Sequence, residues 1–312
     1  MKWPALPFGK SRSQTCKTGT VIDAGKIVLA QVDQPNGGRG KLRFCHIEAS
    51  DANQLSKLAR QYDLSHQECH TVMPLGSYHL LLIESPEVPA PELRAAVRWR
   101  IRELIDFHVD DAVLDVFDAP ASGARGQTHL YVVVSRSADV KQLADSLQDA
   151  GINLSVIDIP ELALRNLAAQ LPEDEQGVAM LYFGAQRGLM ALCRNRTLYL
   201  ARTLDLGLER LREAIIDGQT EALFDGLALE VQRSLDYYDR HFQQAPITHL
   251  LITPLAEPLP GLVESLSSSI GLKVRMLQLA EIVEGADKVP ADQIGESVLA
   301  IGAALRSESK SL

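Results

Sequence analysis

The sequence contains few of the residues that mark disulfide-rich, nucleic-acid-binding or membrane-spanning proteins. Its four cysteines are scattered over 312 residues without a Cys-x-x-Cys pair, which excludes a disulfide framework and a zinc ribbon. Aromatic residues make up 5% of the chain and the formal net charge is −9, so we expect no nucleic-acid partner. No apolar run approaches the roughly 20 residues that span a bilayer. The composition predicts a soluble, acidic globular protein.

The charge is distributed unevenly along the chain. The first 17 residues hold four cations and no carboxylate, together with Trp3, Leu6 and Phe8. Pro4 and Pro7 argue against an amphipathic helix in this leader. Two interpretations stay open: a solubilising segment, or a weak contact with an anionic inner-membrane surface, where each cation contributes about 1 kcal/mol.

The hydrophobic pattern indicates an internal duplication. Each half of the chain begins with a predicted three-stranded meander and continues with alternating helices and strands. The meanders are expected at residues 20–22, 27–32 and 42–47, and at residues 178–182, 188–193 and 197–203. Two α/β domains that each open with a meander are typical of the actin-like fold.

Prolines and polar joints predict the domain boundaries. Prolines 86, 89 and 91 precede an extra helix and two strands in the first half, and residues 172–177 form a polar joint between the halves. We therefore expect a basic flexible leader at 1–17, a first domain at 18–172 with an inserted subdomain at about 86–150, a second domain at 173–306, and a flexible tail at 307–312.

Several segments, taken in order and spacing, resemble a known family. They are residues 97–106 (VRWRIRELID) and 112–118 in the insert, 150–159 (AGINLSVIDI) with 161–164 (ELAL), 229–238 (LEVQRSLDYY), and 301–306 (IGAALR). Together they resemble the MshI family of mannose-sensitive haemagglutinin (MSHA) pilus biogenesis, relatives of the type IV pilus protein PilM. The resemblance implies an α/β actin-like (RNase H-like) two-domain fold with an FtsA/PilM-type inserted subdomain.

Actin-like ATPases hold a Mg-nucleotide between their domains, and three signatures of that site are altered here. In the first half, Asp23 and Gly25 occupy the Asp-x-Gly pattern, but an ordinary hairpin turn at 23–26 explains them better. In the second half, Tyr182 replaces the family's aspartate two residues before Gly184. Residues 254–256 (Pro-Leu-Ala) replace a glycine pair. The resemblance therefore implies a pseudo-ATPase with no catalytic residue and no cofactor.

Other motifs carry weaker signals. Residues 19–26 lack the spacing and the Ser/Thr of a P-loop, so we reject that interpretation. His66, Cys69 and His70 are expected in a loop, and the segment 106–111 (DFHVDD) in a solvated turn, so neither predicts a metal site.

A cluster of arginines around Trp99 is a candidate partner-binding patch. Trp and Arg are enriched at binding hot spots, which favours Arg98, Trp99 and Arg102 as contact residues. The alternative is that Trp99 packs inside the insert while the arginines cover solvent. The sequence does not decide between the two.

The resemblance implies a non-catalytic, cytoplasmic scaffold, peripheral to the inner membrane, in the MSHA/type IV pilus assembly platform. Its partner would be the cytoplasmic tail of a PilN-like membrane protein (MshJ), added as a strand or bound in a groove between the first domain and the insert. The alternative is an ATP-binding switch, in which Asp23, Gly25 and Gly184 hold Mg-ATP and the nucleotide sets the interdomain angle.

Overall fold

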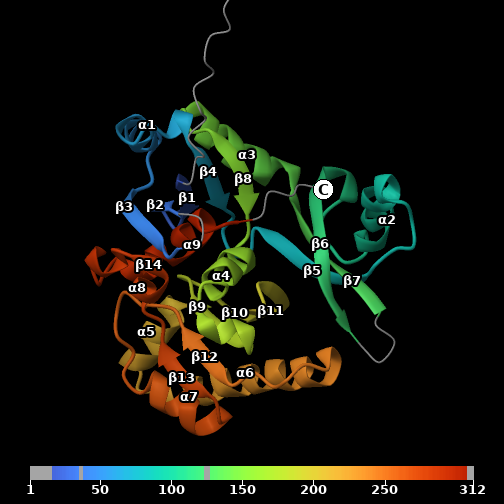
Figure 1. The fold of residues 1–312 in the computed structure, drawn as a ribbon, viewed down its shortest axis with the longest axis vertical. Coiled ribbons are helices and arrows are strands. Elements are labelled where there is room, and N and C mark those ends of the chain that lie inside the picture. Colours follow the sequence, from blue (N-terminus) through green and yellow to red (C-terminus); the bar gives the residue numbers. More distant parts are fainter. Residues whose placement is uncertain (1–15, 35–37, 123–126, 308–312) are drawn as a thin grey trace, which may run out of the picture.

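The structure of the protein, a computed structural model, describes residues 16–34, 38–122 and 127–307, and within them the strands form three sheets (Figure 1). The predicted leader up to residue 15 and the tail from residue 308 lie outside the described residues. Short 3-10 helices lie at Leu64–His66, Val109–Asp111, Pro172–Glu175 and Ala286–Lys288.

The first domain is built on a six-stranded sheet with the order β14-β3-β2-β1-β4-β8. Its strands are β1 (Cys16–Asp23), β2 (Lys26–Asp33), β3 (Gly40–Ala49), β4 (Glu68–Val72), β8 (Leu154–Asp158) and β14 (Val283–Glu284). β1, β2 and β3 form the predicted antiparallel meander, and β4 and β8 follow in parallel. One face packs against α1 (Ala52–Gln61) and α3 (Ser137–Asp149) through Leu55, Leu58 and Leu147.

The second domain repeats this plan with a five-stranded sheet of order β11-β10-β9-β12-β13. Its strands are β9 (Val178–Phe183), β10 (Gly188–Arg194), β11 (Thr197–Leu204), β12 (His249–Ile252) and β13 (Lys273–Met276). The outer face packs against α5 (Leu208–Ile216), α6 (Thr220–Phe242) and α7 (Leu262–Ile270). The apolar stripe predicted for α6 is confirmed, because its residues are buried against this sheet: Phe224, Leu227, Val231, Leu235, Tyr238 and Phe242.

Two helices fill the space between the large sheets: α4 (Pro160–Ala168) and α9 (Ile294–Ala304) (Figure 1). All nine residues of α4 are buried. Close approach is possible because of glycines: a Cβ on Gly302 would lie 2.4 Å from the carbonyl oxygen of Ala163, and one on Gly19 would lie 1.8 Å from that of Ala300. These contacts fix the relation between α4, α9 and the first sheet.

The C-terminal segment returns to the first domain. After α8 (Leu279–Ile282), β14 pairs with β3, and α9 packs on β1, β2 and β4. The sequence placed these residues in the second domain, up to residue 306. The difference arises because α9 is buried without interruption from Ser297 to Ala304, so its sequence has no polar face there that indicates which sheet it covers.

The insert is a three-stranded antiparallel sheet of order β5-β7-β6 with one helix, α2 (Ala90–Ile101). Its strands are β5 (Tyr78–Glu84), β6 (Ala112–Ser122) and β7 (Gln127–Arg136). Val97 and Ile101 of α2 cover one face of this sheet. The insert sheet thus begins at β5, before the expected start of the insert near residue 86. Helix α3 was expected inside the insert, but it packs with α1 of the first domain. Among the described residues, we find no helix with the length and apolar character of a membrane span.

Candidate functional site: the interdomain cleft

The turns that follow β1 and β9 face each other across a cleft between the domains. Two adjoining cavities, of about 350 and 250 Å³, occupy this interdomain cleft. Their shared lining comes from both sheets and the start of α5: Val21, Asp23, Ala24, Tyr182, Gly184, Ala185 and Glu209. The structure thus brings Asp23 and Gly184 together, whereas Gly25 borders a separate pocket beside β3.

The first-half signature folds as the preferred hairpin turn. Asp23 pairs with Lys26, and the two residues between them, Ala24 and Gly25, have positive φ angles of 47° and 73°. Two-residue hairpins favour such angles because they match the twist of the strands. The Oδ1 atom of Asp23 accepts a hydrogen bond from the backbone N–H of Ala24 at 2.8 Å. This carboxylate therefore makes a hydrogen bond within the turn to which it belongs.

The second-half turn at 184–187 is packed against the start of α5. The backbone N–H groups of Leu208 and Glu209 donate to the carbonyls of Gly184 and Ala185 at 2.9 and 3.0 Å. A Cβ on Gly207 would lie 2.3 to 2.6 Å from three backbone atoms of this turn. The start of α5 therefore holds the turn in place and occupies the space beside it.

Tyr182 stands where the family sequence has an aspartate, and its ring lines both cavities. Burial, with a further contribution from the carboxylates of Asp23 and Glu296, raises the pKa of its hydroxyl well above the usual value. The group is therefore a neutral phenol at physiological pH. A phenol supplies none of the negative charge that a Mg²⁺ ion and its bound waters require.

The third side of the cleft is closed by the loop after β12. A Cβ on Gly295, in the first turn of α9, would lie 2.9 Å from the carbonyl oxygen of Pro254 and 3.0 Å from the nitrogen of Ala256. The loop therefore contacts α9 directly, where a glycine pair would leave space for an adenosine.

The charged groups at the cleft are also a poor match to a triphosphate. Lys26 is neutralised by Glu296, with Nζ and Oε1 2.5 Å apart, and Arg212 forms two bonds with Glu257 at 3.0 and 3.1 Å. Phosphates would face the carboxylates of Asp23 and Glu209, with Arg187 as a further cation that lines the larger cavity. Because Tyr182 supplies no charge to a metal ion, the residues present remain a poor fit for a Mg-nucleotide.

A further cavity, of about 400 Å³, lies between the insert and the second domain. It separates β5 from β11, and in the described part of the chain each of these strands is at the edge of its sheet. Leu80 and Leu82 of β5 line one side, and Leu200 and Thr203 of β11 line the other. We call it the β5–β11 cavity. An edge strand beside an apolar surface is a ready site for strand addition.

A buried carboxyl group lies at one end of the β5–β11 cavity. Tyr78 donates its hydroxyl hydrogen to Oε2 of Glu161 on α4 at 2.5 Å. Burial raises the pKa of Glu161 to about 7. The sequence analysis missed this pair. Its one signal was a glutamate among apolar residues at 161–164 (ELAL), a segment that we used only for the family resemblance.

The arginine and tryptophan cluster lies on α2, away from both cavities. Trp99 is 74% exposed, which excludes the alternative that it packs inside the insert. Arg98 donates to the carbonyls of Val109 and Ala112, so it also holds the loop after α2. The guanidinium of Arg102 lies 5.5 Å from the centre of the Trp99 ring.

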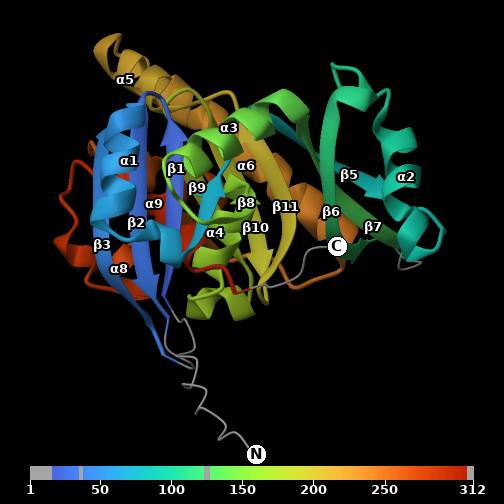
Figure 2. The ribbon, with the colours of Figure 1, turned by 90° about the horizontal axis from the view of Figure 1, so that it is seen from above.

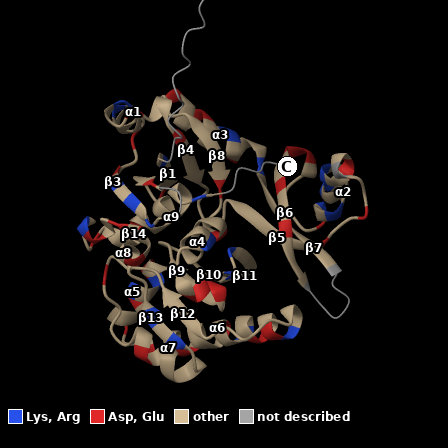
Figure 3. Cartoon of the chain, viewed as in Figure 1, with Lys and Arg blue, Asp and Glu red and all other residues tan. Residues whose placement is uncertain are grey.

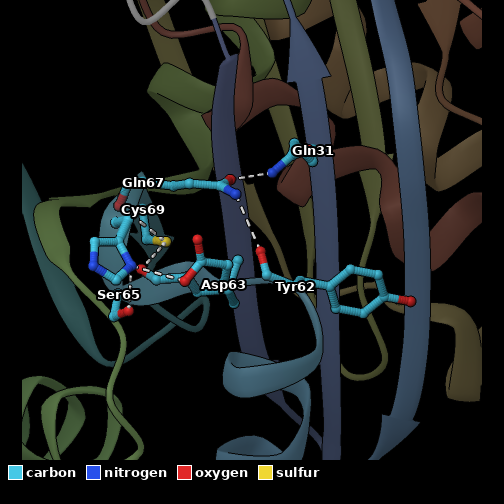
Figure 4. Close-up of polar contacts among 8 residues, drawn as sticks. Gln31, Tyr62, Asp63, Ser65, Gln67 and Cys69 are labelled. Carbon is cyan, nitrogen blue, oxygen red and sulfur yellow. Dashed lines mark hydrogen bonds and ion pairs between the residues drawn. The ribbon is translucent and has the colours of Figure 1, made fainter.

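The histidine and cysteine motif is not a loop, as the sequence suggested, because Cys69 and His70 lie in β4 and are buried. The sulfur of Cys69 lies 3.7 Å from the carbonyl oxygens of Leu64 and Gln67 (Figure 4), and His70 Nδ1 lies 3.1 Å from that of Ala303. His66 is exposed and contacts Asp63. Within the described ranges, no three His, Cys, Asp or Glu side chains are grouped to hold a metal ion.

The comparisons with known proteins agree with this architecture. A family model, type IV pilus assembly protein PilM, matches residues 50–226. A chain from the PilM-PilN type IV pilus biogenesis complex is similar in structure, with a TM-score of 0.73 and 21% identity over 95% of this chain and 99% of that one.

Two further structures share the fold at lower similarity. The cytoplasmic domain of EpsL, an inner-membrane component of the type II secretion system of Vibrio cholerae, has a TM-score of 0.50 and 11% identity over 91% of this chain and 94% of its own. An actin-like ATPase-fold protein from Bacteroides thetaiotaomicron has a TM-score of 0.50 and 9% identity over 93% and 96%. A search of curated proteins gives no match. The fold is the predicted actin-like one, and, since the family model covers more than half of the sequence, the chain belongs to the PilM family of type IV pilus assembly proteins.

Proposed function

We propose that this chain is a non-catalytic scaffold of the inner-membrane assembly platform of a type IV pilus, of the MSHA type served by MshI proteins. Membership of the PilM family supports the pilus role. The resemblance of residues 97–106 and 229–238 to MshI sequences supports the MSHA assignment. The protein would act in the cytoplasm, at the inner surface of the membrane.

The proposed partner is the cytoplasmic tail of a PilN-like membrane protein, MshJ in the MSHA system. The similar chain of known structure comes from a PilM-PilN complex, which supports a partner of this class. We place the tail in the β5–β11 cavity, paired as an added strand with β5. The observation that carries this placement is the edge of β5, with Leu80 and Leu82 facing the cavity. Backbone hydrogen bonds would supply affinity, and alternate side chains would enter the cavity, whose lining is part leucine and part polar.

The cleft is proposed to be a pseudo-ATPase site that holds no cofactor. The phenol of Tyr182, the loop at Pro254 and the paired cations support this proposal. The rival proposal is an ATP-dependent switch, which is favoured by one observation: Asp23 and Gly184 line the same cavity. A Mg-ATP titration separates the two.

Peripheral membrane contact is the third part of the proposal. The leader, residues 1–17, is rich in cations, and a partner tail anchored in the inner membrane would hold the protein near anionic lipids. This contact would assist the interaction with the tail through avidity.

Tail binding is tested by titrating the full chain with a synthetic peptide of the N-terminal cytoplasmic tail of the PilN-like partner. Leu82→Asp places a charge on the cavity face of β5 and is expected to weaken binding at least ten-fold. Val113→Asp is the matched control, because Val113 is similarly exposed on the same sheet face but at the opposite edge, on β6. Binding that is unchanged in Leu82→Asp, or equally weakened in both variants, would contradict the placement.

A further inference from the structure

Two exposed surfaces have no role in the function proposed above, and the first is a groove on the insert. The insert groove, of about 790 Å³, lies between the end of α2 and the loop that follows it. Trp99, Ile105 and Phe107 supply its apolar lining, and the neighbouring Leu104 is also exposed. Large apolar groups gathered at one exposed place mark an interaction site.

Helix α2, which borders the insert groove, carries several basic residues, drawn blue on its ribbon in Figure 3. Residues 94–102 contain four arginines and no carboxylate. Arg98 and Arg100 donate to backbone carbonyls, and Arg102 lies over the Trp99 ring, so these three keep their positive charge. On the opposite wall, the carboxylate of Asp106 is balanced by Arg136 at 3.6 Å, whereas Asp110 contacts only His108 among the described residues and keeps one negative charge there.

The second surface is the corner between α5 and α6, residues 213–225. Ile216 at the end of α5 is 83% exposed, and Ile215 beside it is also exposed. The corner carries four carboxylates and no cation: Glu213, Asp217, Glu221 and Asp225. None of them forms an ion pair with another residue in the part of the chain that the structure describes. The corner therefore presents exposed isoleucine side chains with acidic residues around them.

The two surfaces complement each other and lie on opposite sides of the molecule. An aliphatic projection with four negative charges matches an aromatic groove with an arginine wall, in shape and in sign. Figures 1 and 2 place α2 and α5 on opposite sides in both views. A contact between them therefore joins different copies of the chain and leaves one surface of each type free at the ends.

We propose that the chain associates with itself head to tail, with Ile216 of one copy seated in the insert groove beside Trp99 of the next. Such a contact is heterologous, so it propagates into strings or closes into a ring. It leaves the β5–β11 cavity free, and it extends the scaffold along the membrane independently of which tail the protein binds.

The test is sedimentation velocity of the full chain across a range of concentrations at low salt. The wild type is expected to form species larger than a dimer, and added salt is expected to weaken association several-fold, because the charges at both surfaces are exposed. Ile216→Ser and Trp99→Ala are each expected to weaken association at least ten-fold. Leu229→Ser is the matched control, because Leu229 is an exposed apolar residue on α6 outside both surfaces.

The most specific test is to mix the two variants in which self-association is expected to be weakened. Each variant keeps one intact surface, so a mixture of Ile216→Ser and Trp99→Ala is expected to form a one-to-one dimer and nothing larger. A wild-type chain that stays monomeric at every concentration would overturn the proposal. So would a mixture that stays monomeric while the wild type associates, since that indicates a different contact. Binding of the groove to anionic vesicles, lost in Trp99→Ala and without self-association, would assign the groove to a lipid surface instead.

Discussion

The interdomain cleft and the β5–β11 cavity differ in how their walls are built. In the cleft, backbone approaches backbone at Gly207 and Gly295, and the cation of Lys26 is paired. In the cavity, two strand edges remain open and Leu82 is exposed. Under the proposed function, the same actin-like frame would lack ligands for a nucleotide at the cleft and would offer a strand edge to a peptide at the cavity.

The proposed function would make this chain an example of a scaffold that lost one function and kept another. Nucleotide binding depends on single residues at fixed places, and Tyr182 or Pro254 is enough to remove one of them. Strand addition depends mainly on backbone groups at an edge, which side-chain substitution alters little. The cavity therefore tolerates sequence change that the cleft does not.

The largest expected effect concerns the packed wall of the cleft. Gly207→Ala adds a Cβ that would lie within 2.6 Å of three backbone atoms of the turn at 184–187, so the turn must move. We expect a loss of about 3 kcal/mol or more in the free energy of unfolding, measured with urea. The control is Gly226→Ala in α6, where a Cβ meets nothing within 4 Å and helix propensity predicts a gain of up to about 1 kcal/mol. Equal stability of the two variants would show that the cleft wall is loosely packed.

The next effect concerns the buried carboxyl of the β5–β11 cavity. The pKa of Glu161 is raised from 4.5 to about 7 in the folded chain, so the folded state holds a proton that the unfolded state has lost between these values. Its contribution to stability is therefore greatest below pH 4.5 and decreases as the pH rises to 7, by the order of 2–3 kcal/mol.

Urea unfolding between pH 4.5 and 8 measures this contribution. Glu161→Gln cannot lose a proton, so its stability relative to the wild type is expected to rise across that range. Glu264→Gln, at an exposed position on α7, is the control and is expected to follow the wild type. A constant difference between Glu161→Gln and the wild type would contradict the raised pKa.

The smallest effect concerns the ion pair at the cleft. The side chains of Lys26 and Glu296 are 51% and 29% exposed, and pairs of this kind are screened by solvent. Lys26→Ala is expected to change the free energy of unfolding by less than about 1 kcal/mol in thermal or urea unfolding. A loss above 2 kcal/mol would mean that charge, rather than packing, holds the cleft closed.

Much of the fold could be predicted because its periodicity is strong. The meanders and the stripe on α6, from Phe224 to Phe242, follow simple patterns. Two elements were harder to predict from the sequence. β4 carries Glu68 and His70 among few apolar residues, so its sequence does not look like a central strand. α9 is buried from Ser297 to Ala304, and only its three-dimensional packing, including the close approach of Gly19 on β1, assigns it to the first sheet.

The candidate sites were harder to predict from the sequence than the fold. Local motifs located Asp23 and Gly184, which line one cavity, and Trp99, which is exposed. The β5–β11 cavity was missed because its walls come from segments far apart in sequence, joined by the pair of Tyr78 and Glu161. No local sequence pattern indicates a contact between residues that lie so far apart in the chain.

The most direct test of the central claim is the melting temperature of the full chain, titrated with Mg-ATP to millimolar concentration. A ligand present at 100 times its dissociation constant adds about 2.7 kcal/mol to the stability of the folded state, which is a clear shift. We expect no shift, because Tyr182, the loop at Pro254 and the paired Lys26 are a poor match to a Mg-nucleotide. A Mg-dependent rise in melting temperature would contradict it and establish the chain as an ATP-binding switch.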